Sequence, residues 1–255
     1  MLCLTLIRRI EGGGQGILPL IIMSTKNSAI RKKRMAGYFI DAYNQLAEED
    51  TPITIRSLAE YAGFNSATIY SYFENLEHVQ AYALLRLSSN IWTEASRLNK
   101  EENRPLMRFF NIWQAVCFVA FHQPRMFSCL LTHTNQAYIY EFVDGYMELF
   151  EEEYQGYDDM MKSIIHCRSV RERGLAYIRP CVENGTFTAA EAVQIFDCGT
   201  MLICGAVYQT LWYPDADIEH YRQLFFDGFL TIVKKRLLKD EDVFDEFYVK
   251  VLGSS

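Results

Sequence analysis

Hydrophobic residues recur with a helical period along almost the whole chain after Ser24, and no stretch shows the strict alternation typical of a β-strand. We therefore predict an all-α protein. Proline and glycine residues divide the pattern into separate segments. The expected helices cover residues 28–48, 76–98, 104–123, 124–131, 136–154, 159–184, 189–212 and 217–238, together with two short helices between residues 54 and 73.

The two short helices are joined at a glycine. Thr54 is a suitable N-cap for the first of them, and its apolar residues recur at i, i+3, i+4 and i+7 from Ile55. Gly63 suits the left-handed conformation that ends a helix, and Asn65 is a suitable cap for the second helix. This pattern predicts a helix-turn-helix unit within an N-terminal domain over residues 23–75.

The second short helix places small hydroxyl groups and tyrosines together. Ile69 and Phe73 would point inward at i and i+4, which leaves on the other sides Ser66, Thr68, Tyr70, Ser71 and Tyr72. Hydroxyl groups of this kind donate to phosphate oxygens or touch base edges, and the free amides of a helix start bind phosphate. The geometry alone fits DNA binding and a plain two-helix corner equally well.

The segment Ile53–Val79, ITIRSLAEYAGFNSATIYSYFENLEHV, resembles the DNA-binding signature of the tetracycline-repressor (TetR) family. The matching positions open the first short helix, flank the turn and fill the recognition helix: Thr54, Arg56, Leu58, Ala59, Ala62, Gly63, Thr68, Tyr70, Tyr72 and Phe73. The resemblance implies a three-helix DNA-binding domain followed by a larger helical domain for ligand binding and dimerisation. It further implies a homodimeric repressor that binds double-stranded operator DNA and is released by a small-molecule effector.

Carried over position by position, the resemblance implies a set of DNA-contacting residues: Thr54, Arg56, Asn65, Ser66, Thr68, Tyr70 and Tyr72. The basic run near the start of the first helix adds Arg31 and Lys33, although a solvated helix face explains that run as well. Leu76 departs from the family, because a phosphate-binding lysine is common at that position. The recognition helix Ser66–Tyr72 also contains no Lys, Arg, Asn or Gln. We therefore expect weak or very salt-sensitive DNA binding. The alternative is a helical dimeric module that binds a ligand or a protein and has weak or lost DNA binding.

Residues 76–238 are expected to form the regulatory and dimerisation domain, followed by a C-terminal tail over residues 239–255. Residues 1–22 are expected to be an extension that is either disordered or translated from an upstream start codon. The middle helices are rich in aromatic residues and sulfur, which suits a pocket for an apolar or aromatic small molecule as well as an ordinary core. The candidate pocket residues are Phe110, Trp113, Gln114, Cys117 and Tyr146, with Gln114 as the polar group.

The last two expected helices suggest a dimer interface. The segment Phe196–Trp212 is apolar almost all round, so it must be buried on every side. The candidate interface residues are Gly199, Leu202, Gly205, Ala206, Phe225, Phe229 and Ile232. An ordinary core within one chain is the alternative.

Composition and charge narrow the functional classes. The net charge of −7 argues against a generally basic nucleic-acid-binding surface but leaves room for a local basic patch. The seven cysteines include no CxxC pair, which favours reduced thiols in a cytoplasmic protein. The apolar segment Ala192–Trp212 carries Gln194, Asp197 and Gln209, so a buried helix explains it better than a membrane span.

No catalytic chemistry is expected from this sequence. The histidines are isolated, and neither a nucleotide-binding loop nor a hydrolase triad is present. The acidic run Glu151–Glu153 is interpreted as a solvated helix end. We therefore predict a protein that is not an enzyme and has no catalytic residues, metal or cofactor.

Overall fold

The computed structural model describes residues 17–131, 139–164, 166–167, 169–213 and 215–253, with side chains from residue 28 onward. Its regular secondary structure is helical wherever it is described, which confirms the all-α prediction. The elements are α1 (Ile17–Glu48), α2 (Ile55–Tyr61), α3 (Ser66–Tyr70), α4 (Leu76–Leu98), α5 (Pro105–His122), α6 (Pro124–Leu131), α8 (Val143–Leu149), the 3-10 helix η2 (Glu151–Tyr154), α9 (Asp159–Ile164), α10 (Val170–Glu183), α11 (Ala189–Trp212), α12 (Ile218–Lys234) and α13 (Glu241–Leu252).

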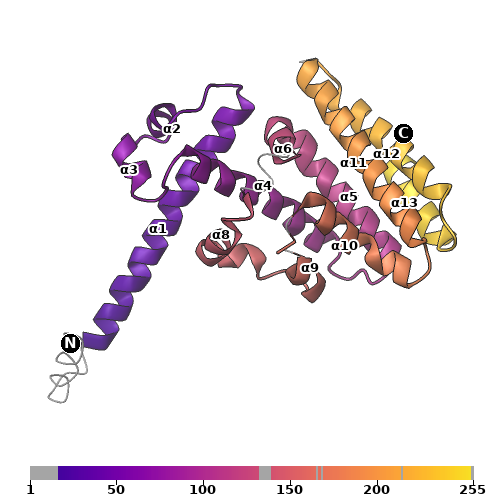
Figure 1. The fold of residues 1–255 in the computed structure, drawn as a ribbon, viewed down its shortest axis with the longest axis horizontal. Helices are drawn as coiled ribbons and strands as arrows, with labels where there is room; N and C mark the ends of the chain where they lie inside the picture. Colours follow the sequence, from indigo (N-terminus) through magenta and orange to yellow (C-terminus); the bar gives the residue numbers. More distant parts are fainter. Residues whose placement is uncertain (1–16, 132–138, 165, 168, 214, 254–255) are drawn as a thin grey trace.

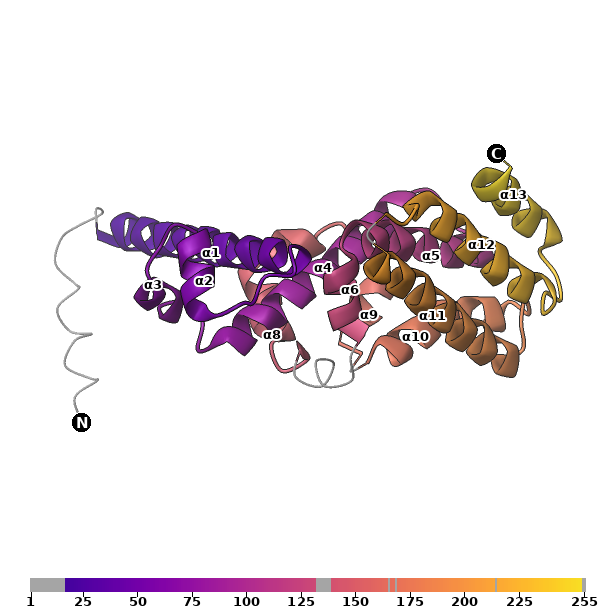
Figure 2. The same ribbon diagram turned by 90° about the horizontal axis from the view of Figure 1, so that it is seen from above.

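The molecule is elongated, with α1, α2 and α3 at one end and the bundle of α5, α10, α11, α12 and α13 at the other (Figure 1). Helix α4 runs from the small N-terminal unit into the bundle, and α8 lies beside it between the two ends (Figures 1 and 2). The N-terminal part of α1 projects away from the rest of the molecule. Residues 17–22 belong to this helix, whereas residues 1–16 of the expected extension lie outside the described residues.

A small aromatic core holds the N-terminal unit together. Phe39 of α1 is completely buried, and its ring centroid lies 5.4 Å from that of Phe64 and 6.3 Å from that of Phe73. Leu58 and Ile69 complete the contact between α1, α2 and α3, and both are completely buried. Each such side chain contributes about 1.5–3 kcal/mol by leaving water, so the short helices α2 and α3 depend on this packing.

Helix α5 is the centre of the larger bundle and packs against α4, α10, α11, α12 and α13. The expected C-terminal tail is wrong, because α13 belongs to this bundle. Val243, Phe244 and Phe247 form the apolar face of α13 and are buried. The ring of Phe247 stacks on Phe110 of α5 with centroids 4.5 Å apart.

Two expected helices are interrupted. The segment 136–154 contains α8 and η2 as separate elements, and its first residues lie outside the described part of the chain. The segment 159–184 is divided into α9 and α10 because a new helix starts at Ser169, whose hydroxyl accepts a hydrogen bond from the backbone amide of Glu172 at 3.0 Å. A serine N-cap ends one helical run and begins another without interrupting the apolar period, so the period alone does not reveal the break.

Helix α11 is the one described helix that is long and apolar enough to cross a membrane by length and composition. It packs against α5, α6, α10 and α12 of the same chain. Its start carries a capping box in which Thr188 and Glu191 satisfy each other's backbone amides. These contacts bury one side of α11, but 33% of its most apolar stretch is buried, so the expected burial on every side is not reached within the single chain.

Candidate nucleic-acid interface and ligand cavity

The turn between α2 and α3 has the predicted cap residues. Thr54 accepts a hydrogen bond from the backbone amide of Ser57 at 3.0 Å, and Ser57 Oγ accepts one from the amide of Thr54 at 2.9 Å. Gly63 has φ of 76°, a left-handed conformation that costs glycine little. Asn65 Oδ1 accepts from the amide of Thr68 at 2.9 Å. The predicted caps of both helices are therefore confirmed.

Tyr70 is exposed, with 59% of its surface accessible, and Ser71 is exposed beside it. Ser66 and Thr68 are half-buried, and Thr68 Oγ1 donates to Asn65 Oδ1 at 3.0 Å. Tyr72 lies beyond the end of α3 and is half-buried, with its ring 6.2 Å from that of Phe39. Of the expected outward-facing hydroxyls, those of Tyr70 and Ser71 belong to exposed residues, and the core fixes the short helix that carries them.

The predicted DNA-contacting cations differ in their partners. Arg56 Nε lies 2.9 Å from Glu60 Oε1 one turn along α2, and this hydrogen bond raises the pKa of Arg56. Lys33 of α1 forms an ion pair with Glu152 of η2, so this lysine links the N-terminal unit to the larger domain. Arg31 is exposed on α1. Leu76 at the start of α4 is half-buried against the core, which explains how an apolar residue is accommodated where the family commonly has lysine.

A polar cluster joins α1, α4, α8 and η2. Arg86 Nη1 donates to Asp41 Oδ1 at 3.3 Å, and Arg86 Nε lies 3.1 Å from Glu153 Oε1. The Tyr146 hydroxyl accepts from Arg86 Nε at 2.8 Å and donates to Glu153 Oε2 at 2.8 Å. Tyr146 is completely buried, and burial raises the pKa of its hydroxyl. The interpretation of Glu151–Glu153 as a solvated helix end agrees with Glu151, which is exposed, but is wrong for Glu153, which is half-buried and binds Arg86 of α4. Glu152 is exposed and pairs with Lys33 of α1.

A second junction joins the end of α1 to the start of α6. Glu48 Oε1 accepts from the backbone amide of Met126 at 2.9 Å, in the first turn of α6. Arg125 Nη1 lies 3.0 Å from Asp50 Oδ1, directly after α1. The N-terminal unit is thus attached to α6 and to η2 as well as to α4.

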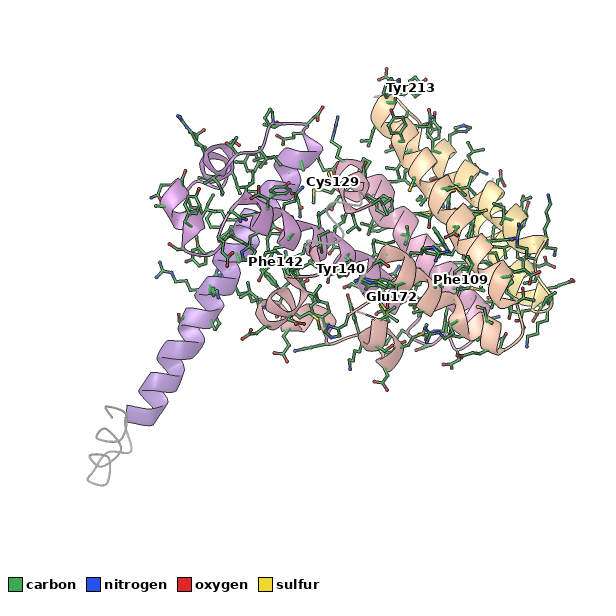
Figure 3. The ribbon with its side chains drawn as sticks, viewed as in Figure 1. Phe109, Cys129, Tyr140, Phe142, Glu172 and Tyr213 are labelled. Atoms are coloured by element: carbon green, nitrogen blue, oxygen red, sulfur yellow. The ribbon has the colours of Figure 1, made fainter. Side chains whose placement is uncertain are left out.

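A cavity of about 90 Å³ lies in the larger domain among α4, α5, α6, α10 and α11. One water needs about 10–15 Å³ by the same measure, so the cavity is several times larger than a single water site. Its wall is mainly apolar and aromatic, and the lining residues are Ser88, Ile91, Trp92, Phe109, Ile112, Trp113, Val116, Phe127, Leu130, Leu131, Val170, Arg173, Gly174, Tyr177, Phe196, Thr200 and Ile203. Figure 3 labels Phe109 on α5, which lines this cavity, and Glu172 on α10, which is the neighbour of the lining residue Arg173.

Among the predicted pocket residues, Trp113 lines this cavity. The others lie elsewhere: Phe110 stacks on Phe247, Gln114 Oε1 accepts from Lys250 Nζ at 3.4 Å, and Cys117 is fully buried. Helix α5 is apolar on several faces, and α13 covers the face that carries Phe110 and Gln114. The cavity is formed instead by the face with Phe109, Ile112, Trp113 and Val116.

Sequence reasoning missed the polar residues of the cavity. Arg173 and Tyr177 lie four residues apart on α10 and are 7% and 3% exposed. Tyr177 accepts a hydrogen bond from Asn99 Nδ2 at 3.2 Å, and burial raises its pKa to about 12. The sequence contained a sign of this, because Val170, Arg173 and Tyr177 are spaced to share one helix face. An arginine therefore stands where the pattern calls for a buried residue.

The candidate dimer residues fall into two groups. Gly199, Ala206, Phe225 and Phe229 are buried within the core of the single chain, so their assignment to an outward-facing interface is corrected. Gly205 is exposed, and Leu202 and Ile232 are half-buried. The outer face of α11 and α12 instead exposes Met201, Tyr208, Trp212 and Leu224 by 54–65%.

The residues that the structure describes contain no group of three histidine, cysteine or acidic side chains placed to hold a metal ion. Comparisons with known proteins give a likeness in fold. No family model matches the chain, and no curated protein matches its sequence. The chain is similar in fold to the crystal structure of a TetR family transcription regulator from Marinobacter aquaeolei VT8, with a TM-score of 0.48, 16% identity, and coverage of 83% of this chain and 98% of that chain.

Proposed function

We propose that this chain is a DNA-binding transcriptional regulator of the TetR type, acting in the cytoplasm as a homodimeric repressor that a small apolar or aromatic ligand releases from operator DNA. The observation that carries the proposal is the orientation of α3. Its apolar residue Ile69 is completely buried in the N-terminal core, while the next residue, Tyr70, is 59% exposed. A helix held in this way presents hydroxyl groups to a major groove.

Ligand control is supported by the path of α4. This helix begins at Leu76, directly after the α3 segment, and its middle residues Ser88, Ile91 and Trp92 line the cavity. A ligand that changes the cavity wall therefore acts on the helix that positions α3. Such a ligand shifts the population between DNA-competent and DNA-incompetent arrangements.

Dimerisation is supported by the outer face of α11 and α12. Met201, Gly205, Tyr208 and Trp212 follow one another at helical spacing, and all are exposed. Nothing lies within 4 Å of a Cβ added at Gly205, so a second helix can approach the backbone there. Large apolar side chains grouped on one surface commonly mark a protein interface.

The DNA-binding proposal is tested by titrating the protein against DNA from directly upstream of its own gene, with scrambled DNA as competitor. Tyr70→Ala should weaken operator binding by about five- to 150-fold, because the dimer loses two hydrogen bonds worth about 0.5–1.5 kcal/mol each. Tyr248→Ala is the matched control, because Tyr248 is an exposed tyrosine on α13. Equal affinity for operator and scrambled DNA, or equal affinity of the two variants, contradicts the proposal.

The salt dependence of the same titration tests the predicted cations. If Arg31, Lys33 and Arg56 of both protomers each bind a phosphate, log Kobs should fall with log salt with a slope of about −5. The ion pairs of Lys33 with Glu152 and of Arg56 with Glu60 compete with this binding and favour the second candidate function. That candidate is a helical dimeric module that binds a ligand or protein with weak or lost DNA binding, and loss of all specific DNA affinity would support it.

The dimer is tested by sedimentation of two matched variants. Tyr208→Asp places a charge on the α11 face, whereas Tyr248→Asp places one on α13, and the two tyrosines are 55% and 45% exposed. We expect Tyr208→Asp to shift the protein toward monomer and Tyr248→Asp to leave the dimer intact. A wild-type protein that sediments as a monomer contradicts this part of the proposal.

A further inference from the structure

Trp113 of α5 leaves a hydrogen-bond donor without a partner beside the cavity. This residue lines the cavity and is 4% exposed, and its Nε1–H has no hydrogen-bond partner among the described residues. A buried donor of this kind is rare in folded proteins, because it loses its hydration without compensation. A ligand atom that accepts a hydrogen bond from this group would restore what burial removes.

The indole ring of Trp113 is oriented by its contact with α11. A Cβ added at Gly199 would lie 2.8 Å from Cζ2 and 2.8 Å from Cη2 of the ring. Cζ2 is bonded to the ring carbon that carries Nε1, so the N–H group lies next to this edge. Around Gly199, α11 contributes Phe196, Thr200 and Ile203 to the cavity wall. The unpartnered N–H is therefore close to the α11 side of the cavity.

The enclosed wall offers a ligand few hydrogen-bond acceptors. Ser88 Oγ accepts from Trp92 Nε1 at 3.2 Å and from Arg173 Nη1 at 3.0 Å, so both of its lone pairs are used. The hydroxyl of Tyr177 already accepts from Asn99 Nδ2 at 3.2 Å. Arginine and tryptophan side chains carry no acceptor. A ligand hydroxyl or amine enclosed here would lose its hydration without gaining a partner.

The remaining hydroxyl of the wall lies at the entrance. Leu131, Val170, Phe196 and Thr200 line both the cavity and an open groove at the surface, between α10 and α11. Thr200 is half-buried, so its hydroxyl belongs to this entrance. A ligand that passes between the two helices therefore meets aromatic rings and the Trp113 N–H in the enclosed part.

We propose that the cavity binds an uncharged aromatic carbonyl compound of one ring, such as an aromatic ketone or aldehyde, whose carbonyl oxygen accepts a hydrogen bond from Trp113 Nε1. A carbonyl supplies an acceptor without a donor, and in a mainly apolar wall it loses far less hydration than an ion. An apolar cavity of about 150 Å³ holds benzene. The volume of about 90 Å³ therefore limits the enclosed part of the ligand to one ring. As the class of effector for the regulator, this assignment rests on the proposed function.

The assignment is tested first by calorimetry on the full-length protein without DNA. The probes are acetophenone, 1-phenylethanol, which has the same skeleton with a hydroxyl, and α-methylstyrene, in which a methylene group replaces the carbonyl oxygen. We expect acetophenone to bind saturably and 1-phenylethanol to bind about five- to 150-fold more weakly, because its buried donor stays unpaired. No saturable binding of acetophenone, or equal or tighter binding of 1-phenylethanol, would overturn the assignment.

The indole resonances of the wild-type protein locate the contact. The chain has three tryptophans, Trp92, Trp113 and Trp212, so its proton–nitrogen correlation spectrum has three indole signals, which Trp92→Phe and Trp212→Phe assign. We expect acetophenone to shift the Trp113 N–H proton downfield, as a new hydrogen bond does, and α-methylstyrene to cause no downfield shift. The same response to both probes, or no response of Trp113 to bound acetophenone, would contradict the contact. This measurement holds even if Trp113→Phe fails to fold.

Matched substitutions test the contact through affinity. Trp113→Phe keeps an aromatic ring and removes the N–H, so it should weaken acetophenone relative to α-methylstyrene by about two- to tenfold, the effect of one hydrogen bond. Trp92→Phe makes the same change on the same wall, but the Trp92 N–H already donates to Ser88 Oγ. It should therefore act on both probes alike. An unchanged ratio in folded Trp113→Phe, or the same change in both variants, would overturn the assignment.

The same preparation separates this inference from the proposed function. Acetophenone binding that depends on the Trp113 N–H, in a protein without specific DNA affinity, supports the ligand class and refutes the regulator. Specific DNA binding by a protein that does not bind acetophenone supports the regulator and refutes the ligand class. Release of operator DNA on addition of acetophenone, but not of 1-phenylethanol at the same concentration, would support both.

Discussion

Gly199 of α11 offers a sensitive test of the packing around the cavity. A Cβ at this position would lie 2.8 Å from two ring atoms of Trp113 and 3.0 Å from a ring atom of Phe229. The Trp113 ring cannot easily move away, because Phe225 and Phe229 lie with centroids 5.7 and 4.9 Å from it. Gly199→Ala should therefore force the aromatic layer between α5, α11 and α12 to shift.

The expected magnitude follows from two opposing effects. Overpacking a well-packed core costs about 1–3 kcal/mol, whereas replacing glycine by alanine inside a helix gains about 1 kcal/mol. The net destabilisation of Gly199→Ala is thus roughly 0–2 kcal/mol. Gly37→Ala in α1 is the matched control, because nothing lies within 4 Å of a Cβ at Gly37 and the helix gain is the same. The two variants should differ by about 1–3 kcal/mol, since the helix contribution cancels.

The assay is urea denaturation followed by circular dichroism, with every variant at one protein concentration because dimerisation would make midpoints depend on concentration. In thermal melts each kcal/mol corresponds to about 2–4 °C for a chain of this size. We expect Gly37→Ala to exceed the wild type in stability and Gly199→Ala to fall clearly below Gly37→Ala. Equal stability of the two variants would refute the close packing of α11 on Trp113.

Three other substitutions test separate parts of the molecule by the same denaturation assay. Burial lowers the pKa of His78 below its ordinary value of 6.5, so the unfolded chain binds the proton more tightly and stability should fall as pH drops below 6.5, by at most about 1.4 kcal/mol per pH unit. His78→Gln should remove this pH dependence and exposed His220→Gln should retain it, so equal profiles would contradict the assignment. Phe247→Ala should destabilise the protein by about 3–5 kcal/mol and exposed Tyr248→Ala far less, whereas similar effects would mean that α13 is not part of the core. Tyr146→Phe should cost about 1–3 kcal/mol, because it leaves the half-buried charged groups of Arg86 and Glu153 without the hydroxyl that bonds to both, and an unchanged midpoint would contradict that network.

The helix-turn-helix unit could be predicted closely from the sequence because its signals are local. Thr54 and Asn65 cap helices through hydrogen bonds three residues away, and Gly63 adopts a conformation that few other residues tolerate. Each of these choices is fixed by the residue and its nearest neighbours. The ends of α4 and α11 were predicted for the same reason.

The ligand cavity could not be predicted in the same way because its location depends on distant elements. Helix α5 is apolar on several faces, and α13, which was taken for a tail, decides that Phe110 is core while Trp113 faces the cavity. Glu152 and Glu153 of η2 were assigned to solvent because their partners, Lys33 and Arg86, lie far away in the sequence. Residues that act through long-range partners require the fold before their role can be inferred.

Lys33 forms an ion pair with Glu152, so on the proposed function this carboxylate and a DNA phosphate compete for the same ammonium group. A DNA phosphate that binds Lys33 must displace the Glu152 carboxylate of the larger domain. By thermodynamic reciprocity, whatever strengthens the hold of η2 on Lys33 weakens the hold on DNA, and DNA loosens η2 by the same free energy. On the proposed function, Lys33 binds either a phosphate of the operator or Glu152 of the larger domain, but not both at once.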